Sequence, residues 1–257
     1  MFRLSVCEGT VLRDLPFLER VRTISRAGFG VDLWGWEDDA LDAIADDAEI
    51  EICAMPGWSG GSMMHPDGIE DFLAGVKENL TVAERIGCRN LSITTGRLDE
   101  RGQMAHNIAA HPATKWISAY KTLCEVAELA EKNDVTYSLE QLNTKVDHAG
   151  YPLRFTEDVV RLIEQVGSPR IRLLCDIYHV QIEEGSVVQS VRDYHSFIGY
   201  VHVADVPGRH EPGTGEINYP RIVSTLREVG YQGVVGMEAF PQADAQQAME
   251  QFRALFS

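Results

Sequence analysis

The sequence predicts an α/β protein that folds as a single (β/α)8 barrel domain over residues 1–257. Three observations lead to this prediction. Short apolar runs recur along the whole chain, and segments with helical periodicity separate them. Several runs are almost continuously apolar, which is typical of strands buried on both faces of a parallel sheet. No glycine-rich phosphate-binding turn follows a run, which argues against the rival fold, an open doubly wound sheet.

The eight expected strands cover residues 2–8, 30–36, 50–56, 90–96, 135–141, 171–178, 200–206 and 233–240. The first helical segment places four apolar side chains on one face: Phe17, Leu18, Val21 and Ile24. The fourth begins near Pro112, and its expected apolar face is formed by Trp116, Tyr120, Leu123, Ala127 and Ala130. Glycines such as Gly87 and Gly167 follow helical segments, where they suit helix C-caps.

Composition narrows the classes of function. Acidic residues number 39 and basic residues 23, for a net charge of −16. This excess opposes binding to nucleic acid phosphates. No apolar run is long enough to span a membrane, and we expect a cytoplasmic protein. The five cysteines are scattered without metal-ligand spacing, which favours buried, reduced thiols.

Four groups able to do chemistry lie late in the last four expected strands, namely Glu140, Asp176, His202 and Glu238. In a (β/α)8 barrel, active sites form where the strands end. Three buried carboxylates at one mouth would be costly and would repel one another. A divalent cation removes both difficulties, and the mostly hard donor set suits Mn²⁺ or Mg²⁺, with Co²⁺ or Zn²⁺ as alternatives. For any one of these residues taken alone, a simpler interpretation exists: an acid would pair with a basic neighbour, and the histidine would be a hydrogen-bonded core residue.

The stretches around these residues carry a family resemblance. "EQLNTKVDHAGYPL", "LLCDIYHVQIEEG", "VHVADVPGRHEPGTGEINY" and "GYQGVVGMEAF" resemble the hydroxypyruvate isomerase family, one of the xylose isomerase-like barrels that include the ketose 3-epimerases. The resemblance implies that the four residues bind a metal and that Glu140 and Glu238 also act as acid and base. It further implies that His179 and Arg209 contact substrate. His202 departs from the glutamine of the family's isomerases and matches the epimerases.

The implied activity is a metal-dependent isomerisation of a small hydroxy-carbonyl compound, with hydroxypyruvate giving tartronate semialdehyde through an enediolate. The alternative is a ketose 3-epimerase acting on a tetrulose, pentulose or hexulose. A zinc endonuclease for abasic DNA is a remote alternative, and a barrel that only binds a small ligand is the non-enzyme alternative. The expected partner is a small sugar or hydroxy acid, without nucleic acid or membrane, and analogy with the family favours a homo-oligomer.

Two loops add expected substrate contacts. Gly208, Gly213 and Gly215 let the loop after the seventh strand turn tightly over the barrel mouth, where Arg209, His210 and Glu211 would point at substrate. The alternative is a solvated loop in which Arg209 pairs with Glu211. Trp58, after the third strand, would either wall one side of a small polar substrate or lie at the surface or in an interface, and the same alternatives apply to Trp34. Three histidines lie in expected loops or helix starts without ligand spacing, and we expect them to face solvent: His65, His106 and His111. Glu8 is expected in a solvated loop.

Overall fold

The strands close into a barrel, as the sequence predicts. The computed structural model describes residues 2–99, 101–105 and 109–257. Eight parallel strands pair in chain order from β1 to β8, and β8 pairs with β1. The strands are β1 (Arg3–Cys7), β2 (Gly30–Asp32), β3 (Ile52–Pro56), β4 (Asn90–Ile93), β5 (Thr136–Glu140), β6 (Ile171–Asp176), β7 (Ile198–Val203) and β8 (Val234–Met237).

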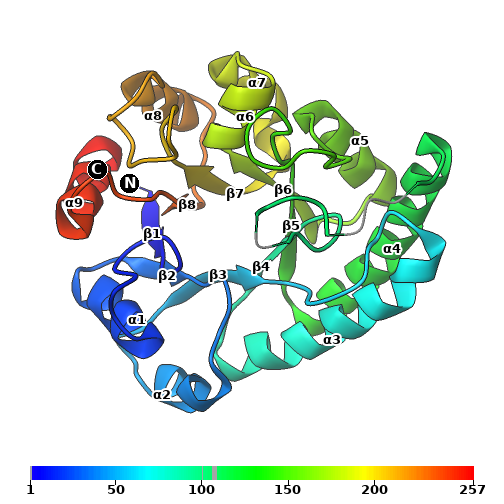
Figure 1. The fold of residues 1–257 in the computed structure, drawn as a ribbon, viewed down its shortest axis with the longest axis horizontal. Coiled ribbons are helices and arrows are strands. Elements are labelled where there is room, and N and C mark those ends of the chain that lie inside the picture. Colours follow the sequence, from blue (N-terminus) through cyan, green and yellow to red (C-terminus); the bar gives the residue numbers. More distant parts are fainter. Residues whose placement is uncertain (1, 100, 106–108) are drawn as a thin grey trace.

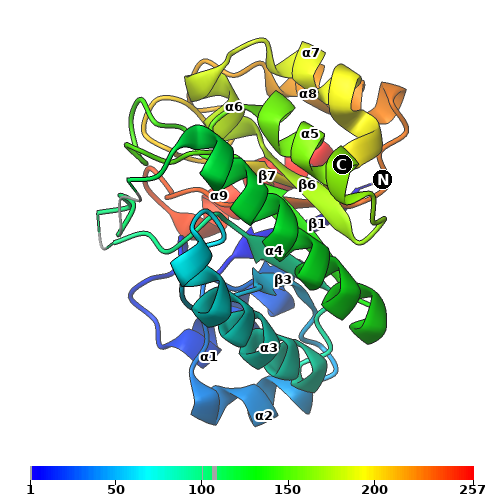
Figure 2. The same ribbon diagram turned by 90° about the vertical axis from the view of Figure 1, so that its right-hand side faces the viewer.

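Helices surround the barrel on its outer face (Figure 1). The α-helices are α1 (Phe17–Arg26), α2 (Leu41–Ala45), α3 (Ile69–Arg85), α4 (Pro112–Asn133), α5 (Thr156–Val166), α6 (Ile177–Glu183), α7 (Val187–Tyr194), α8 (Tyr219–Glu228) and α9 (Ala245–Phe256). Three short 3-10 helices are η1 (Asp38–Ala40), η2 (Pro66–Gly68) and η3 (His195–Phe197). Figure 2 shows α3 and α4 side by side on the outside of the barrel. Within the described residues, no helix combines the length and apolar character needed to cross a membrane.

Each strand lies where the sequence predicts one, but most are shorter. The second was expected to run from residue 30 to 36 and ends at Asp32, so that Trp34 belongs to the following loop. The last ends at Met237, and Glu238 is the first residue beyond it. Trp34 and Glu238, which lie just beyond these strand ends, line the cavity at the mouth of the barrel.

The apolar faces of the helices pack on the strands. In α1, Phe17, Val21 and Ile24 are buried as expected. In α4 the predicted face is partly wrong, because Tyr120 is exposed. Leu123, Ala127 and Ala130 are buried as expected, and Ala119 and Val126 complete the apolar part of the buried stripe. A long helix carrying alanine at several positions has two possible apolar stripes, and packing against the barrel selects one.

The register of the sheet sets the functional groups side by side. In the β6–β7 pair, Asp176 lies opposite His202. In the β7–β8 pair, His202 lies opposite Gly236, and a Cβ atom at that glycine would lie 2.3 Å from a carboxylate oxygen of Asp32. The absence of a side chain at Gly236 therefore leaves room for Asp32 beneath His202.

Candidate active site

The four residues singled out by the sequence converge at the carboxyl end of the barrel. One ligand atom from each of Glu140, Asp176, His202 and Glu238 lies within 4.8 Å of all the others. Glu140 and Asp176 are the last residues of β5 and β6, His202 lies in β7, and Glu238 follows β8. Adjacent parallel strands that end at the same level bring these side chains together across the mouth. All four are at least nine-tenths buried.

The donor atoms fit a divalent cation. Within the described part of the chain, carboxylates face both ring nitrogens of His202 without forming a hydrogen bond of good geometry, and the Oε1 atom of Glu140 lacks a partner. Buried polar atoms are normally partnered, so these atoms call for one. Oxygens on opposite sides of a Mg²⁺ ion lie about 4.2 Å apart, which is close to the spread observed here. Three carboxylates and one imidazole would therefore hold such an ion after small side-chain movements.

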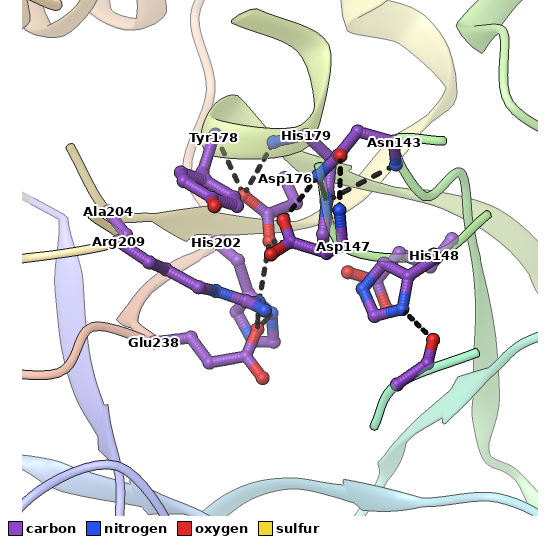
Figure 3. A network of polar contacts seen from close by, with 12 residues as sticks. Asn143, Asp147, His148, Asp176, Tyr178, His179, His202, Ala204, Arg209 and Glu238 are labelled. Carbon is purple, nitrogen blue, oxygen red and sulfur yellow. Dashed lines mark hydrogen bonds and ion pairs between the residues drawn. The ribbon is translucent and has the colours of Figure 1, made fainter. Parts of the chain in front are cut away.

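Arg209 enters the same cluster from the loop after β7 (Figure 3). Its Nη2 atom lies 2.8 Å from Glu238 Oε2 and 3.4 Å from Asp176 Oδ2. The guanidinium also lies over the ring of Tyr178, 5.0 Å from the ring centroid. Arg209 has a positive φ of 55°, a conformation that costs energy for a residue with a side chain. The loop thus holds Arg209 in a strained backbone position at the centre of the cluster.

The carboxyl groups have opposite pKa shifts. Burial raises the pKa of Glu140, and the negative charges of Glu238 and Asp176 raise it further. Burial also opposes ionisation of Glu238, but Arg209 and His202 outweigh it and hold the pKa of Glu238 well below its usual range. In the absence of a cation, Glu238 is therefore ionised and Glu140 tends to keep its proton. Environments that separate two carboxyl pKa values in this way are typical of acid–base pairs.

A buried hydrogen-bond network that the sequence did not reveal lies beneath His202. Ser5 and Tyr200 donate hydroxyl hydrogen bonds of 2.8 and 2.6 Å to Asp32, whose Oδ2 lies 3.5 Å from His202 Nε2. On the other side of the ring, Nδ1 lies 3.1 Å from Glu238 Oε2. Burial alone would lower the pKa of His202, but Asp32 and Glu238 raise it well above the usual value. Asp32 thus faces Nε2 of His202, whereas Nδ1 of His202 faces Glu238.

His179 is held by the loop after β5. The backbone amide of Asn143 donates to His179 Nδ1 at 3.3 Å, and the side-chain amide of Asn143 lies 2.7 Å from the same atom. The side-chain oxygen of Asn143 accepts from the amides of Val146 and Asp147, which fixes the orientation of the Asn143 amide. Nδ1 of His179 is therefore the acceptor, and the neutral ring carries its proton on Nε2, 3.5 Å from Asp176 Oδ2. Burial, with the nearby Arg209 charge, lowers the pKa of His179.

The loop after β7 is built around Asp205, which was not predicted from the sequence. This fully buried carboxylate accepts hydrogen bonds from the backbone amides of Val206, Gly213 and Ile217, at 2.8 to 3.0 Å. The three contacts fold the glycine-rich segment back on itself and present Arg209 to the cluster. An aspartate in "VHVAD" followed by glycines was the available signal, because such carboxylates commonly organise turns.

The loop directs Glu211 away from the cluster. Its carboxylate accepts a 2.9 Å hydrogen bond from the Gln242 amide, and Glu211 is not among the residues that line the cavity. Its expected substrate contact therefore has no support in the geometry. Trp58 does line the cavity, on the wall formed by the β3 loop. Trp34, whose role the sequence left open, also lines it and donates its indole N–H to Glu238.

Other sequence expectations have mixed outcomes. Glu8 is buried instead of solvated and pairs with Arg20 at 2.7 Å. His65 and His111 accept backbone hydrogen bonds at the starts of η2 and α4, and His111 is exposed. His106 lies outside the described residues.

The cavity above the cluster has a volume of about 410 Å³.

Comparison with known proteins agrees with this architecture. A family model described as the xylose isomerase-like TIM barrel matches residues 21–255. A putative hydroxypyruvate isomerase of Homo sapiens is 30% identical over 255 residues, which cover 95% of this chain and 90% of that protein. A 2-oxo-tetronate isomerase of Cupriavidus necator is 30% identical over 194 residues, covering 74% of this chain and 71% of that protein.

Solved structures show the same fold. An AP endonuclease, family 2, from Brucella melitensis superimposes with a TM-score of 0.89 at 26% identity, over 99% of both chains. A D-psicose 3-epimerase from Clostridium cellulolyticum H10 superimposes with a TM-score of 0.81 at 19% identity, over 100% of both chains. The second likeness concerns the fold alone.

Proposed function

Because the chain belongs to the xylose isomerase-like TIM barrel family, we propose that it is a metal-dependent isomerase of a small hydroxy-carbonyl compound. The proposed reaction converts hydroxypyruvate to tartronate semialdehyde. The curated relatives named as hydroxypyruvate isomerase and 2-oxo-tetronate isomerase support this reaction class.

One observation carries the proposal. Four buried groups from β5 to β8 place their ligand atoms within 4.8 Å of one another, at the end of the barrel where a cavity opens. Glu140, Asp176, His202 and Glu238 would hold a divalent cation, with Mn²⁺ or Mg²⁺ favoured by the three carboxylates. When bound, such a cation polarises a carbonyl group and offsets the negative charge that develops on the substrate oxygens.

The residues around the cluster would bind and orient the substrate. His179 presents an N–H group from Nε2, and Arg209 presents a guanidinium that already contacts two carboxylates. Both groups donate hydrogen bonds, so they favour oxygens that gain negative charge as the enediolate forms. Trp34 and Trp58 line the cavity and reduce the access of water to the reacting carbons.

The two glutamates would move the proton. Glu238 is held ionised by Arg209 and is suited to remove a proton from C3 of hydroxypyruvate. Glu140, on a strand separated from β8 by two others, would return a proton to C2. The hydroxyl proton passes from O3 to O2 during the same conversion, and exchange with solvent returns the proton from Glu238 to Glu140, so that atoms and charge balance over one cycle. The reaction is a net transfer of hydrogen between neighbouring carbons.

A second candidate reaction is the 3-epimerisation of a tetrulose, pentulose or hexulose. His202 favours it, because the epimerases resembled by this sequence carry histidine at this position. With the same two glutamates, the proton would leave and return at one carbon from opposite faces. In that reaction the carbonyl group does not move.

Cleavage of abasic DNA has less support. One of the solved structures is that of a protein named as an AP endonuclease. The net charge of −16 works against contact with a phosphate backbone, which depends on basic side chains. Among the described residues that line the cavity above the cluster, Arg209 is the one arginine or lysine, which leaves little positive charge for a phosphate backbone.

The test is solvent isotope exchange by the purified protein in D₂O with Mn²⁺ or Mg²⁺. Proton NMR follows hydroxypyruvate, tetruloses, pentuloses and hexuloses. We expect deuterium in tartronate semialdehyde, metal-dependent turnover, and a loss of at least about 1000-fold in Glu238→Gln. Glu250→Gln, an exposed carboxylate on α9, serves as the matched control. Deuterium uptake at C3 of a ketose without movement of the carbonyl would indicate the epimerase, and uptake by no substrate would reject both.

A further inference from the structure

His148 lies in the loop after β5, on the wall of the cavity near the cluster. Its side chain is 7% exposed and lines the cavity together with Glu140 and His179. Figure 3 shows the His148 ring directed toward the space between His202, Glu238 and His179. The ring centroids of His148 and His179 are 5.2 Å apart. Nothing in the sequence pattern singled out this residue.

The loop holds His148 rigidly. The amide of His148 donates to the Asn143 carbonyl, and its own carbonyl accepts from the amide of Tyr151, both at 3.0 Å. The hydroxyl of Tyr151 donates at 2.9 Å to the carbonyl of Glu140, the last residue of β5. The ring of His148 is thereby fixed relative to the catalytic end of the strand.

The hydrogen bonds of His148 determine which nitrogen carries the proton. Nδ1 lies 2.6 Å from the carbonyl oxygen of Gly102, and a carbonyl can only accept. Nδ1 must therefore be the protonated nitrogen, and in the neutral ring Nε2 is an acceptor with a free lone pair. Burial lowers the pKa of His148, which favours the neutral ring. Among the described residues, buried Nε2 has no hydrogen-bond partner.

A second cation is a poor partner for this nitrogen. Asp147, His148 and His179 have ligand atoms within 4.8 Å of one another. However, Nδ1 of His179 accepts from Asn143, and its Nε2 carries the proton. The Oδ2 atom of Asp147 accepts from the side chain of Asn143 at 2.7 Å. The group therefore offers one free imidazole lone pair, from His148, and the other carboxylate oxygen of Asp147, which are too few ligands for a dedicated metal site.

We propose that His148 Nε2 accepts a hydrogen bond from a substrate hydroxyl group that lies beyond the two reacting carbons. This inference rests on the proposed isomerase and specifies its substrate class, namely 2-oxo acids or ketoses with at least four carbons and a further hydroxyl group. Hydroxypyruvate is then accepted, but it is the poorer substrate. Nε2 cannot serve a methyl group or a carboxylate in the same way, because neither donates a hydrogen bond.

The cavity supports a substrate of this size. Its volume of about 410 Å³ corresponds to on the order of a dozen water molecules at ~30 Å³ each, whereas hydroxypyruvate has only seven non-hydrogen atoms. On the cavity wall formed by the β3 loop, buried Nε1 of Trp58 also lacks a partner among the described residues. A donor and an acceptor left open in one cavity suit hydroxyl groups, which both accept and donate.

The experiment compares two substrates that differ by one oxygen. With Mn²⁺-loaded protein, kcat/KM is measured for 3,4-dihydroxy-2-oxobutanoate and for 3-hydroxy-2-oxobutanoate, which lacks the terminal hydroxyl. We expect the wild type to favour the dihydroxy acid by about 10- to 100-fold, because loss of that hydroxyl leaves a buried acceptor unpaired. His148→Asn should remove this preference, since the Asn amide can still donate to Gly102 but offers no acceptor at Nε2. His148→Gln places a side-chain amide, whose oxygen can accept a hydrogen bond, near the position of Nε2 and should recover part of the preference for the dihydroxy acid.

Two further readouts keep the inference separate from the isomerase proposal. Calorimetry of the Mg²⁺-loaded protein measures the affinity for both acids without requiring turnover, and the same 10- to 100-fold ratio is expected. Turnover of hydroxypyruvate alone reports on the proposed function. An unchanged substrate ratio in His148→Asn, binding of neither acid, or two bound cations per chain with one at His148 would overturn the inference.

Discussion

Arg209 and Glu238 form the central ion pair of the barrel mouth, with Nη2 of the arginine 2.8 Å from Oε2 of the glutamate. The same guanidinium nitrogen lies 3.4 Å from Asp176. Burial opposes ionisation of Arg209, but the surrounding carboxylates outweigh it and raise its pKa. A permanent positive charge therefore keeps Glu238 ionised in the position where the proposed reaction needs a base. The ion pair joins the loop after β7, which we propose binds substrate, to the carboxylate that we propose transfers the proton.

Replacement of Arg209 by lysine tests this geometry. Lysine keeps the charge but loses the planar fork and the contact with the Tyr178 ring. We expect kcat/KM to fall by about 10- to 100-fold, while Arg192→Lys, at an exposed ion pair with Glu228, leaves it unchanged. Steady-state kinetics on the best substrate measures the effect. Normal kcat/KM in Arg209→Lys would show that only the charge matters.

Affinity for a divalent cation should increase with pH. Asp32 and Glu238 overcome burial and raise the pKa of His202, so the metal-free protein holds a proton on the imidazole that is proposed to bind the cation. A cation must displace this proton. Calorimetric titration with Mn²⁺ in buffers of different ionisation enthalpy measures both the affinity and the protons released. Affinity that is constant from pH 6 to 8 with no proton release would contradict the assignment.

The stability of the metal-free protein should also depend on Glu140. Its folded pKa lies above its ordinary value near 4.5, so the folded state holds an extra proton between those two values. The free energy of unfolding contributed by this group therefore falls as the pH rises through that window, by at most about 1.4 kcal/mol per pH unit. Chemical denaturation with EDTA present should show that the free energy of unfolding falls less steeply with rising pH in Glu140→Gln than in the wild type. Parallel curves would mean that Glu140 titrates normally.

Asp205 should be essential for loop geometry without touching substrate. Asp205→Asn replaces one carboxylate oxygen by an amide nitrogen, which cannot accept from the backbone amides that now bind there. We expect a loss of about 1–3 kcal/mol in the free energy of unfolding and a rise in KM as Arg209 loses its position. Chemical denaturation and kinetics measure both effects. Wild-type stability and KM in Asp205→Asn would show that the loop does not depend on this carboxylate.

The sequence predicted the barrel and the four clustered residues because both leave local signals. Apolar runs of strand length identify buried parallel strands, and an acid such as Asp176 inside such a run stands out. Strand ends were less predictable. Trp34 continues the apolar pattern of its strand but lies in the loop beyond it, because pairing at the mouth is decided by neighbouring strands.

The supporting residues could not be predicted in the same way. Asp32 and His148 are far in sequence from the groups they contact, Tyr200 and Gly102, and their surroundings depend on the closed barrel. Glu8 pairs with Arg20, which is nearer in sequence, but the strand pattern alone does not show that this pair is buried. The direction of Glu211 was equally hard to predict, because a polar loop residue beside Arg209 can point to either side. The backbone amide of Gln242, 31 positions later in the chain, draws it away from the cavity.

The proposed function depends above all on a single cation held jointly by the last four strands. Anomalous diffraction from crystals of the protein grown with Mn²⁺ would locate this ion. We predict one strong anomalous peak at about 2.0–2.6 Å from ligand atoms of Glu140, Asp176, His202 and Glu238. No peak at that position in Mn²⁺-saturated crystals, or a peak bound by other residues, would refute the joint metal site.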